Sequence, residues 1–390
     1  MHLFVLIEST HQNKKLKLNV GGAANQLIEI LRSYEKIKEI KISLATKYSE
    51  YIPKTNKVKI YQIHKFKFTP LDTLYFMVKI IKKIKKIHKK EHIDVIDING
   101  NPFYVLSAYI SRFLFKIPIL MKMPLDFDSY IRWVYMLENK KLYAQMVNFS
   151  FFKFFKIFLL KKTDFIRPIN AKMAKDLVDL KFPKKRILLI PNGIDRKKYE
   201  NIAIKSRNIV HFGYVGRLTE FKNLRFLVEV FQTYLSKYPE DKLLIYGEGS
   251  EKEWILDFIK RNNLEQSIVF EGYEKDKTKI YSNIDVIINP ALAQGISNVN
   301  LEAMSTKTLV IAANVHGNRD LIKHGTNGLL FNPFEKPDLL KQLYCYKENS
   351  GNIQKIIINA ENEIIQKYDI DVIANRIYNF FNTFLKNRKI

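Results

Sequence analysis

Short runs of branched and aromatic residues alternate with longer amphipathic stretches along the whole chain. Runs of about four to eight such residues are typical of buried strands, and the stretches between them have the spacing of helices. An alternation of strands and helices predicts α/β units built on parallel sheets. In the first half of the chain, the predicted strands are Leu3–Ile7, Ile40–Ala45, Lys57–Gln62, Ile93–Ile98 and Arg186–Ile190.

The second half continues the same alternation. Its predicted strands are Ile209–Val215, Lys242–Gly247, Ile268–Glu271, Val286–Asn289 and Leu309–Ala312. With 390 residues, of which 47% are hydrophobic, the chain is long enough for two domains with cores of their own. We therefore predict one domain over residues 1–198, a second over residues 207–370, and a final helix over residues 371–390. Apolar residues at helical spacing support this last helix: Ile373, Ile377, Phe380, Phe381 and Phe384.

One strand-to-helix junction in the second half has the composition of a ligand-binding loop. The run Ile284–Asn289 is closed by Pro290, and the polar, small and acidic stretch Gln294–Glu302 leads into the next helix. In α/β sheets, ligands bind outside the carboxyl ends of the strands, where helix amino termini favour anions. Glu302 is the expected acceptor of hydrogen bonds from sugar or ribose hydroxyls.

Five short motifs follow one another in a family-specific order. They are Pro191–Asp195, Gly213–Asn223, Tyr246–Gly249, Gln294–Glu302 and Gly325–Phe331. Together they resemble the signatures of retaining glycosyltransferases of family 4. The resemblance implies an α/β fold of the GT-B type, with two Rossmann-like domains facing each other across a cleft. It also implies that the first domain takes the acceptor, that the second takes the donor, and that the final helix crosses back to the first domain.

The same resemblance implies the chemistry of the site. Arg217 and Lys222 would flank the diphosphate of a UDP- or GDP-sugar and stabilise the leaving group, as a planar fork and a mobile point charge. Because these cations take the place of a divalent metal, we expect no metal and no cofactor apart from the donor. The implied donor-binding residues are Gly21, Gly22, Gly216, Gly247, Gly249, Gln294, Gly295, Ile296, Ser297, Asn298 and Glu302. By themselves, Gly21 and Gly22 also fit a plain loop before a helix.

Two features depart from the family pattern. The first glutamate of the family's E-x(7)-E loop is Gln294 here, and an amide keeps a hydrogen-bond acceptor but loses the negative charge. A degenerate, non-catalytic homologue is the alternative explanation. The histidine that many relatives carry after an amino-terminal strand is missing, since Ile117–Pro124 holds Lys122 and methionines instead. Asp126 and Asp128 follow, as candidates for acceptor contact or as solvated loop residues.

The positive charge of the chain is concentrated in its first half. The net charge is +26, and residues 1–200 carry 40 Lys and Arg against 17 Asp and Glu, whereas residues 201–390 carry 25 against 22. Within residues 76–92, methionine and isoleucines form one helical stripe and lysines cover the rest. Such a helix can lie in an anionic membrane interface, or it can be a surface helix whose isoleucines pack on the sheet. The lysines assigned to membrane contact are Lys79, Lys82, Lys83, Lys85 and Lys86.

Other features of the sequence bear on membrane contact, disulfide formation and nucleic-acid binding. The phenylalanine-rich segment 149–160 is too short and charged to span a membrane, and it fits lipid contact, an acceptor channel or a buried helix. The single Cys345 excludes an intramolecular disulfide. Because Met1–Phe4 enters a predicted strand directly and no long uncharged apolar run occurs, we expect neither export nor a membrane span. No nucleic-acid-binding module is recognisable, so nucleic acid is not an expected partner.

These observations together predict an enzyme. We expect a cytoplasmic glycosyltransferase, peripheral on the cytoplasmic face of the membrane. It would move a sugar from a nucleotide-diphosphate donor to a lipid-linked or oligosaccharide acceptor during assembly of a cell-surface polysaccharide or glycoconjugate. Two alternatives belong to other classes: a catalytically weak nucleotide- or carbohydrate-binding homologue, and an adaptor for anionic membranes.

Overall fold

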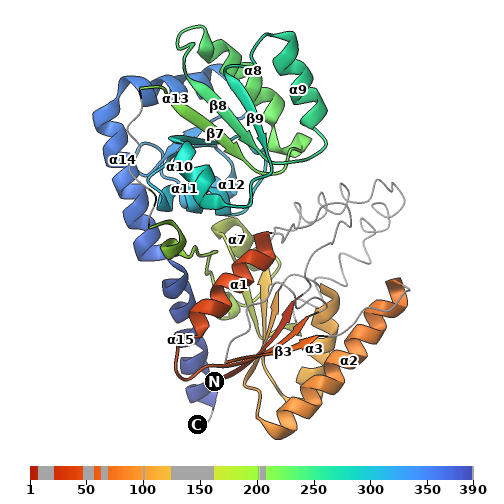
Figure 1. The fold of residues 1–390 in the computed structure, drawn as a ribbon. Coiled ribbons are helices and arrows are strands. Elements are labelled where there is room, and N and C mark those ends of the chain that lie inside the picture. The colour runs from red at the N-terminus through yellow and green to blue at the C-terminus, as the bar shows by residue number, and fades with distance from the viewer. Residues whose placement is uncertain are drawn as a thin grey trace. The chain divides into compact units, whose positions relative to one another are not determined.

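Each half of the chain forms a separate α/β unit. The computed structural model describes residues 1–7, 22–46, 57–62, 69–99, 102–123, 162–200, 202 and 208–388. Its contacts divide the chain into Met1–Gly193 with Ile370–Ile390, and Ile194–Asp369. Each unit contains a six-stranded parallel sheet (Figure 1). The predicted Rossmann-like architecture is therefore confirmed for both halves.

The sheet of the first unit has the strand order β3-β2-β1-β4-β5-β6. Its strands are β1 (His2–Ile7), β2 (Lys41–Thr46), β3 (Val58–Gln62), β4 (Val95–Asn99), β5 (Ile119–Met123) and β6 (Phe165–Pro168). The helices are α1 (Gly22–Tyr34), α2 (Thr69–Lys90), α3 (Pro102–Phe115), α7 (Ala171–Asp179) and α15 (Ile370–Arg388). Short runs of apolar residues form these strands because both faces of a parallel sheet are buried under helices.

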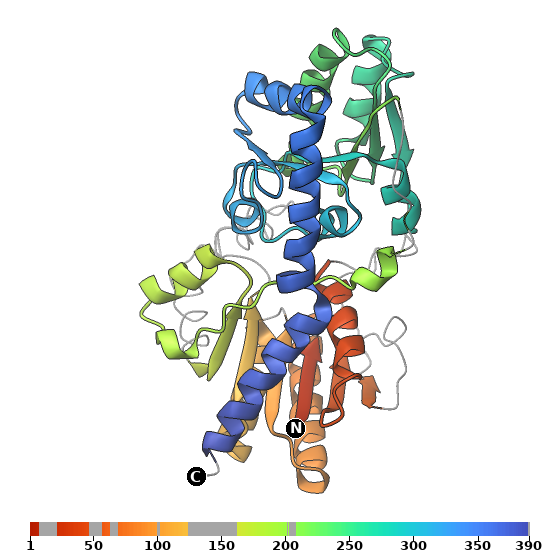
Figure 2. The ribbon, with the colours of Figure 1, turned by 90° about the vertical axis from the view of Figure 1, so that its left-hand side faces the viewer.

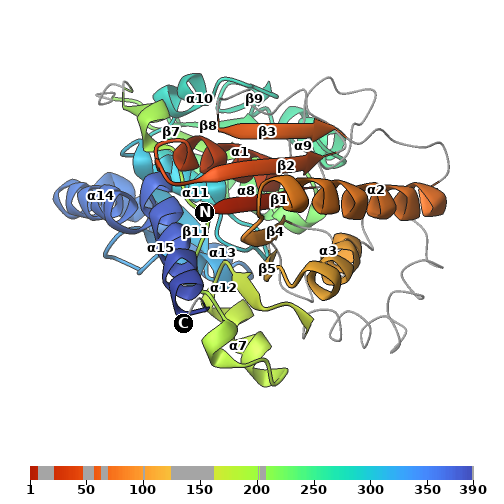
Figure 3. The ribbon, with the colours of Figure 1, turned by 90° about the horizontal axis from the view of Figure 1, so that it is seen from below.

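Alternate residues of each strand enter two different apolar clusters. On one face, Phe4 and Ile96 pack with Ile80 and Ile84 of α2 and with residues of α3 and α7. On the opposite face, strand residues such as Leu120 pack with α1 and α15. Figure 3 shows α2 and α3 on one side of the strands and α15 on the other, and Figure 2 shows α15 along the sheet. The apolar side chains predicted for the final helix therefore bury that helix in the first unit.

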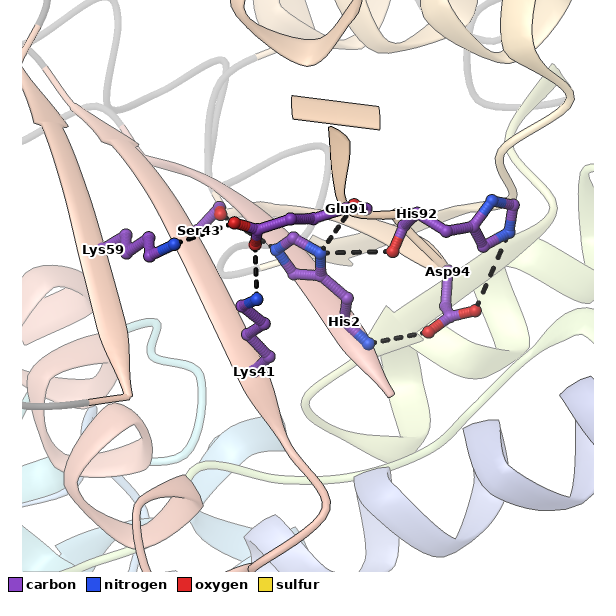
Figure 4. Close-up of polar contacts among 7 residues, drawn as sticks. All are labelled: His2, Lys41, Ser43, Lys59, Glu91, His92 and Asp94. Atoms are coloured by element: carbon purple, nitrogen blue, oxygen red, sulfur yellow. Dashed lines mark hydrogen bonds and ion pairs between the residues drawn. The ribbon is translucent and has the colours of Figure 1, made fainter. Parts of the chain in front are cut away.

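A polar cluster surrounds the amino ends of the first three strands (Figure 4). The buried His2 ring lies 3.1 Å from the Glu91 carbonyl oxygen through Nδ1, and 2.9 Å from the Ser43 hydroxyl through Nε2. Burial lowers the pKa of His2. Hydrogen bonds from Lys41 and Lys59 hold the pKa of Glu91 at about 2. The cluster thus joins β1, β2 and β3 to the segment before β4.

The second unit repeats the same plan, with the strand order β12-β11-β10-β7-β8-β9. Its strands are β7 (His211–Val215), β8 (Lys242–Tyr246), β9 (Ile268–Gly272), β10 (Val286–Asn289), β11 (Leu309–Ala313) and β12 (Leu329–Phe331). The helices are α8 (Leu224–Leu235), α9 (Lys252–Arg261), α10 (Lys277–Asn283), α11 (Asn298–Ser305), α12 (His316–Leu321), α13 (Lys336–Glu348) and α14 (Ser350–Glu363). Two apolar clusters again cover the two faces of the sheet.

One predicted strand does not form. Residue 186 ends a 3-10 turn (Lys184–Arg186), and among the described residues the segment 187–190 makes one bridge, between Ile187 and Ile166 of β6. The Leu188 N–H donates to the Ile166 carbonyl at 2.8 Å. The next bond of a parallel ladder would need the N–H of Pro168, which proline lacks. The apolar run therefore packs beside β6 without extending the sheet.

Candidate functional site

The candidate site lies at the carboxyl edge of the second sheet, where the strand order changes direction. β7 is flanked by β8 on one side and by β10 on the other, so the chain builds outwards from this point in both directions. In open α/β sheets such a switch point is where ligands bind. The loops that leave β7, β8 and β10 carry the predicted site residues, including Arg217, Gly247 and Gln294.

Lys222 lies at this carboxyl edge, between β7 and α8, and its side chain contacts the loop after β10. It ends a 3-10 turn (Glu220–Lys222), and the chain then passes through Asn223 in the left-handed region at φ 57°. The Leu292 N–H donates to the Phe221 carbonyl at 3.2 Å, which ties this turn to the loop after β10. Lys222 Nζ donates to Gln294 Oε1 at 2.8 Å. Burial first, and then the nearby charge of Arg217, lowers the pKa of Lys222 to about 8.

Arg217 lies on the loop between β7 and that turn. Its carbonyl oxygen accepts a hydrogen bond from the Tyr214 hydroxyl at 2.8 Å, and its side chain is exposed. Within the described parts of the chain, no carboxylate forms an ion pair with Arg217 or Lys222, although cations nearby are paired in this way. Arg225, for example, binds Glu251. Two cations that no described carboxylate neutralises, at one sheet edge, have the charge that suits an anionic ligand.

The glycines of this edge allow three backbone segments to pack closely. A Cβ on Gly247 would lie 1.8 Å from the Gly216 carbonyl oxygen, and one on Gly249 would lie 2.1 Å from the Leu218 carbonyl oxygen. Gly216 and Gly247 also have positive φ angles, of 158° and 149°. These glycines are therefore required for loop packing, whether or not a donor also contacts them.

The loop after β10 is fixed from two sides. A Cβ on Gly317 of α12 would lie 2.1 Å from the Gln294 carbonyl oxygen, so the loop rests directly on the backbone of that helix. Ser297 caps α11, because its side chain accepts from the Asn300 N–H at 3.3 Å. The Ile296 side chain is buried in the apolar core, which leaves only its backbone for a ligand.

A chain of buried asparagine side chains supports the same loop from beneath. Asn289 donates to Asn300 at 2.9 Å, Asn300 donates to Asn318 at 3.0 Å, and Asn318 donates to the Ala313 carbonyl at 2.9 Å. The network links β10, α11, α12 and β11. A fully bonded polar network of this kind fixes one arrangement of the loops around it.

Glu302 is oriented by partners that sequence analysis missed. Its Oε2 accepts from the buried Tyr281 hydroxyl at 2.7 Å, and Lys277 Nζ lies 3.4 Å from the same oxygen. Burial first, and then the charge of Glu302, raises the pKa of Tyr281. Tyr281 and Lys277 lie on α10, before the strand that precedes the motif. No sequence spacing links them to Glu302, so only folding reveals the contact.

Comparison with known proteins identifies the family. Residues 210–346 match the family model described as Glycosyl transferases group 1, and residues 20–198 match the model described as Glycosyltransferase Family 4. The two matches cover most of both units. The residues of the candidate site fall within the first match, residues 210–346. The chain is a group 1 glycosyltransferase.

Relatives of this glycosyltransferase are found in archaea and bacteria. Two uncharacterized glycosyltransferases of Methanocaldococcus jannaschii are 28% and 25% identical. The first match covers 51% of this chain and only 54% of the relative, and the second covers 85% and 86%. The UDP-Gal:α-D-GlcNAc-diphosphoundecaprenol α-1,3-galactosyltransferase of Escherichia coli is 25% identical over 78% of this chain and 84% of that enzyme.

Solved structures agree on the fold of the glycosyltransferase. Anabaena HepE in complex with UDP aligns with a TM-score of 0.74 at 18% identity, over 98% of this chain and 100% of that chain. At this identity, the likeness concerns the GT-B fold alone.

Several predicted residues of the glycosyltransferase belong to the first unit or lie outside the described residues. Gly22 is the first residue of α1 in the first unit, whereas Gly21, Asp126, Asp128 and the phenylalanine-rich segment fall outside the residues that the structure describes. The described residues contain no cluster of three or more His, Cys, Asp or Glu that would hold a metal ion.

The lysine-rich helix of the glycosyltransferase is α2. Of its stripe residues, Met77, Ile80, Ile84 and Ile87 are buried on the side of the first sheet, and Ile81 is half-buried. The alternative in which the isoleucines pack on the sheet is therefore the one observed, and the stripe is not free to enter a lipid layer. Most of the lysines assigned to membrane contact are exposed, and Lys83 lies 4.3 Å from the Tyr61 ring centroid. Among the described helices, none is long and apolar enough to cross a membrane.

Proposed function

We propose that this glycosyltransferase moves a sugar, with retention of anomeric configuration, from a UDP- or GDP-sugar to a lipid-linked or glycan acceptor. The observation that carries the proposal is the pair Arg217 and Lys222, which have no carboxylate partner among the described residues and lie at the switch point of the second sheet. A nucleotide diphosphate is an anionic group that such a pair fits. Glu302, on the neighbouring helix, supplies an acceptor for ribose hydroxyls.

The chemistry follows from where charge develops. As the bond between the anomeric carbon and the diphosphate oxygen breaks, both bonding electrons go to the departing diphosphate. Cations held in place before the reaction stabilise that charge without reorganisation. In a retaining transfer, the acceptor hydroxyl attacks on the face that the diphosphate leaves and gives its proton to the departing phosphate oxygen. The proposed reaction therefore needs no carboxylate base and no metal ion.

The acceptor class is proposed from the relatives. The Escherichia coli relative is named for an acceptor in which a sugar is joined to undecaprenol through a diphosphate. We extend this class to the present chain as a sugar carried on a lipid diphosphate. Such an acceptor is membrane-bound, which agrees with the excess of basic residues in the first half of the chain.

The test is a transfer assay with purified protein, a panel of UDP- and GDP-sugars, and a lipid-diphosphate-linked acceptor, in the presence of excess chelator. We expect donor consumption and a product of the same anomeric configuration as the donor. A strict requirement for added magnesium or manganese contradicts the role of the two cations. Nucleotide binding without any transfer or donor hydrolysis favours the catalytically weak homologue.

We also propose a peripheral position on the cytoplasmic face of a membrane, with the exposed face of α2 against anionic lipid. The exposed lysines form a charged surface on the side of α2 that is turned away from the sheet. The end of the neighbouring α3 adds two exposed apolar side chains, Phe113 at 78% and Leu114 at 56%. Basic side chains next to exposed apolar ones are a combination that binds an anionic interface without spanning it. An adaptor role would rest on this surface alone, without nucleotide affinity.

A further inference from the structure

Three neighbouring strands of the first sheet change from an apolar to a charged side chain on the same face as they approach their carboxyl ends. The apolar members belong to the cluster that packs with α15. The charged members come two residues later and therefore point to the same face. The pairs, with the apolar residue first, are Val95 and Asp97 on β4, Leu120 and Lys122 on β5, and Phe165 and Arg167 on β6.

The two cations of this set are neighbours inside the unit. Lys122 lies directly opposite Arg167 in the strand register. Both residues are 4% exposed, and Asp97 is 9% exposed. Two buried cations and a single carboxylate thus lie on the same face of the three strands. Like charges placed side by side in a sheet repel each other, and burial strengthens the repulsion.

The cluster is also incompletely bonded. Arg167 Nε and the hydroxyl of Tyr34 on α1 are buried and have no hydrogen-bond partner in the part of the chain that the structure describes. Within the described residues, no ion pair or hydrogen bond joins Asp97 to either cation. By contrast, the buried Asp241 of the second unit binds the Val210 N–H, the Tyr234 hydroxyl and Lys347. Buried charges in folded proteins are normally paired, and the described residues supply no bonded partner for these two cations.

Burial is also the main cause of the pKa shifts of Asp97, Lys122 and Arg167. Burial raises the pKa of Asp97, and it lowers the pKa of both Lys122 and Arg167. Each change disfavours the charged form, whereas a well-made ion pair would favour it. An anion brought between the two cations would reverse this for both of them.

We propose that Lys122 and Arg167 bind a phosphate group of the acceptor at the carboxyl edge of the first sheet. The proposal rests on the proposed function, because it assigns a chemical feature to the acceptor of that reaction. The fork of Arg167 and the point charge of Lys122 suit the oxygens of a diphosphate. The diphosphate of a lipid-linked acceptor has this chemistry, and so has free pyrophosphate.

The first experiment measures anion binding without turnover. The full chain carries Arg217→Ala and Lys222→Ala, so that the cations of the second unit do not contribute. Inorganic pyrophosphate is titrated calorimetrically at constant ionic strength without divalent metal. We expect saturable binding that Lys122→Met and Arg167→Met each weaken about tenfold or more. Lys175→Met, an exposed lysine on α7, should have no effect. Equal affinity in all variants, or no binding at all, overturns the proposal.

A second variant separates a ligand site from a merely structural cluster. Asp97→Asn removes the negative charge that competes with a phosphate for the two cations. Pyrophosphate should therefore bind severalfold more tightly to this variant. A structural cluster predicts lower thermal stability with no gain in affinity, and that result also overturns the proposal. This variant keeps the test decisive if either methionine variant fails to fold.

Competition then identifies the source of the phosphate. Farnesyl diphosphate should displace pyrophosphate from the protein that carries only Arg217→Ala and Lys222→Ala. This displacement should be lost when Arg167→Met is added. Binding of pyrophosphate without competition by farnesyl diphosphate means an adventitious ion only, and it removes the assignment to the acceptor. Since no donor is present, failure of these experiments is distinct from failure of sugar transfer.

Discussion

Lys222 Nζ donates a hydrogen bond to the side-chain oxygen of Gln294 at 2.8 Å, across 72 residues of sequence. The amide orients the ammonium group without neutralising it. A glutamate at this position would instead form an ion pair with Lys222 and compete with the donor diphosphate for its charge. In this chain the positive charge of Lys222 remains available, although burial lowers its pKa to about 8.

The first prediction concerns the pH dependence that this contact produces. The charged form of Lys222 exists below its pKa, so kcat/KM should be maintained at neutral pH and should fall as the pH rises through about 8. In Gln294→Glu, the carboxylate raises the pKa of Lys222, and the fall moves to higher pH. The measurement is kcat/KM between pH 6.5 and 10 for both proteins. Identical pH profiles of kcat/KM would mean that deprotonation of Lys222 does not cause the fall in kcat/KM at high pH.

The second prediction concerns the two cations themselves. Arg217→Ala and Lys222→Ala should each lower kcat by about a hundredfold, which corresponds to about 3 kcal/mol of transition-state stabilisation. The melting temperature should change little, since neither side chain is ion-paired within the described fold. Arg261→Ala, which removes an exposed arginine paired with Asp257 on α9, is the matched control and should keep full activity. Normal turnover in both alanine variants would remove the catalytic assignment.

The third prediction concerns nucleotide binding by Glu302. Glu302→Gln should weaken UDP binding about tenfold, because hydrogen bonds to a charged acceptor contribute about 1.5–3 kcal/mol. Tyr281→Phe should cause a smaller, severalfold loss, since the hydroxyl only orients the carboxylate. Calorimetry with UDP and with its 2′,3′-dideoxy analogue checks both. The differences between variants should vanish with the analogue, and their persistence would show that Glu302 does not contact the ribose.

The fourth prediction concerns the lysines of α2 that are assigned to membrane contact. Replacing Lys82, Lys83, Lys85 and Lys86 with glutamine should weaken binding to anionic vesicles by several kcal/mol, at about 1 kcal/mol per lysine near the surface. Lys83 should contribute least, because its ammonium group already lies over the Tyr61 ring. Salt should mimic the substitutions, since the Debye length is about 8 Å at physiological ionic strength. Vesicle co-sedimentation measures both effects.

A matched control for that experiment lies on the second unit. Lys275, Lys323, Lys341 and Lys355 are four exposed lysines, and their replacement by glutamine changes the net charge by the same amount. Vesicle binding should then stay close to that of the unchanged protein. Equal losses in the two sets of variants would indicate attraction by net charge, with no defined membrane face.

The fifth prediction concerns acid stability of the first unit. Because burial lowers the pKa of His2 below the unfolded value of 6.5, the unfolded chain takes up a proton before the folded one does. The contribution of His2 is present above pH 6.5 and is lost as the pH falls below that value. Thermal unfolding between pH 7.5 and 5 should show this loss, and His2→Asn should reduce it. Burial also lowers the pKa of His88. His88→Gln therefore serves as the comparison variant over the same pH range.

Sequence analysis predicted most of the fold and named several residues of the candidate site. Strands such as Val286–Asn289 were found to the residue, because a buried parallel strand must be apolar on both faces and turn residues close it. Residues 186–190 had the same apolar pattern but formed no strand, since a missing N–H in Pro168, on a different element, decided the outcome. The motif loops gave Arg217, Lys222 and Glu302, but not Tyr281 or Lys277, which come from a helix elsewhere in the chain.

The sequence by itself determined most of the strands and helices and the order of the motif loops, because local periodicity and turn chemistry are properties of neighbouring residues. Only the tertiary structure decided that the isoleucines of α2 face the sheet, that Lys222 meets Gln294, and that Lys122 and Arg167 lie side by side in the interior. These outcomes depend on which strands become neighbours and in which register. That choice is made by the whole core at once, because the buried side chains of all the strands must fit together.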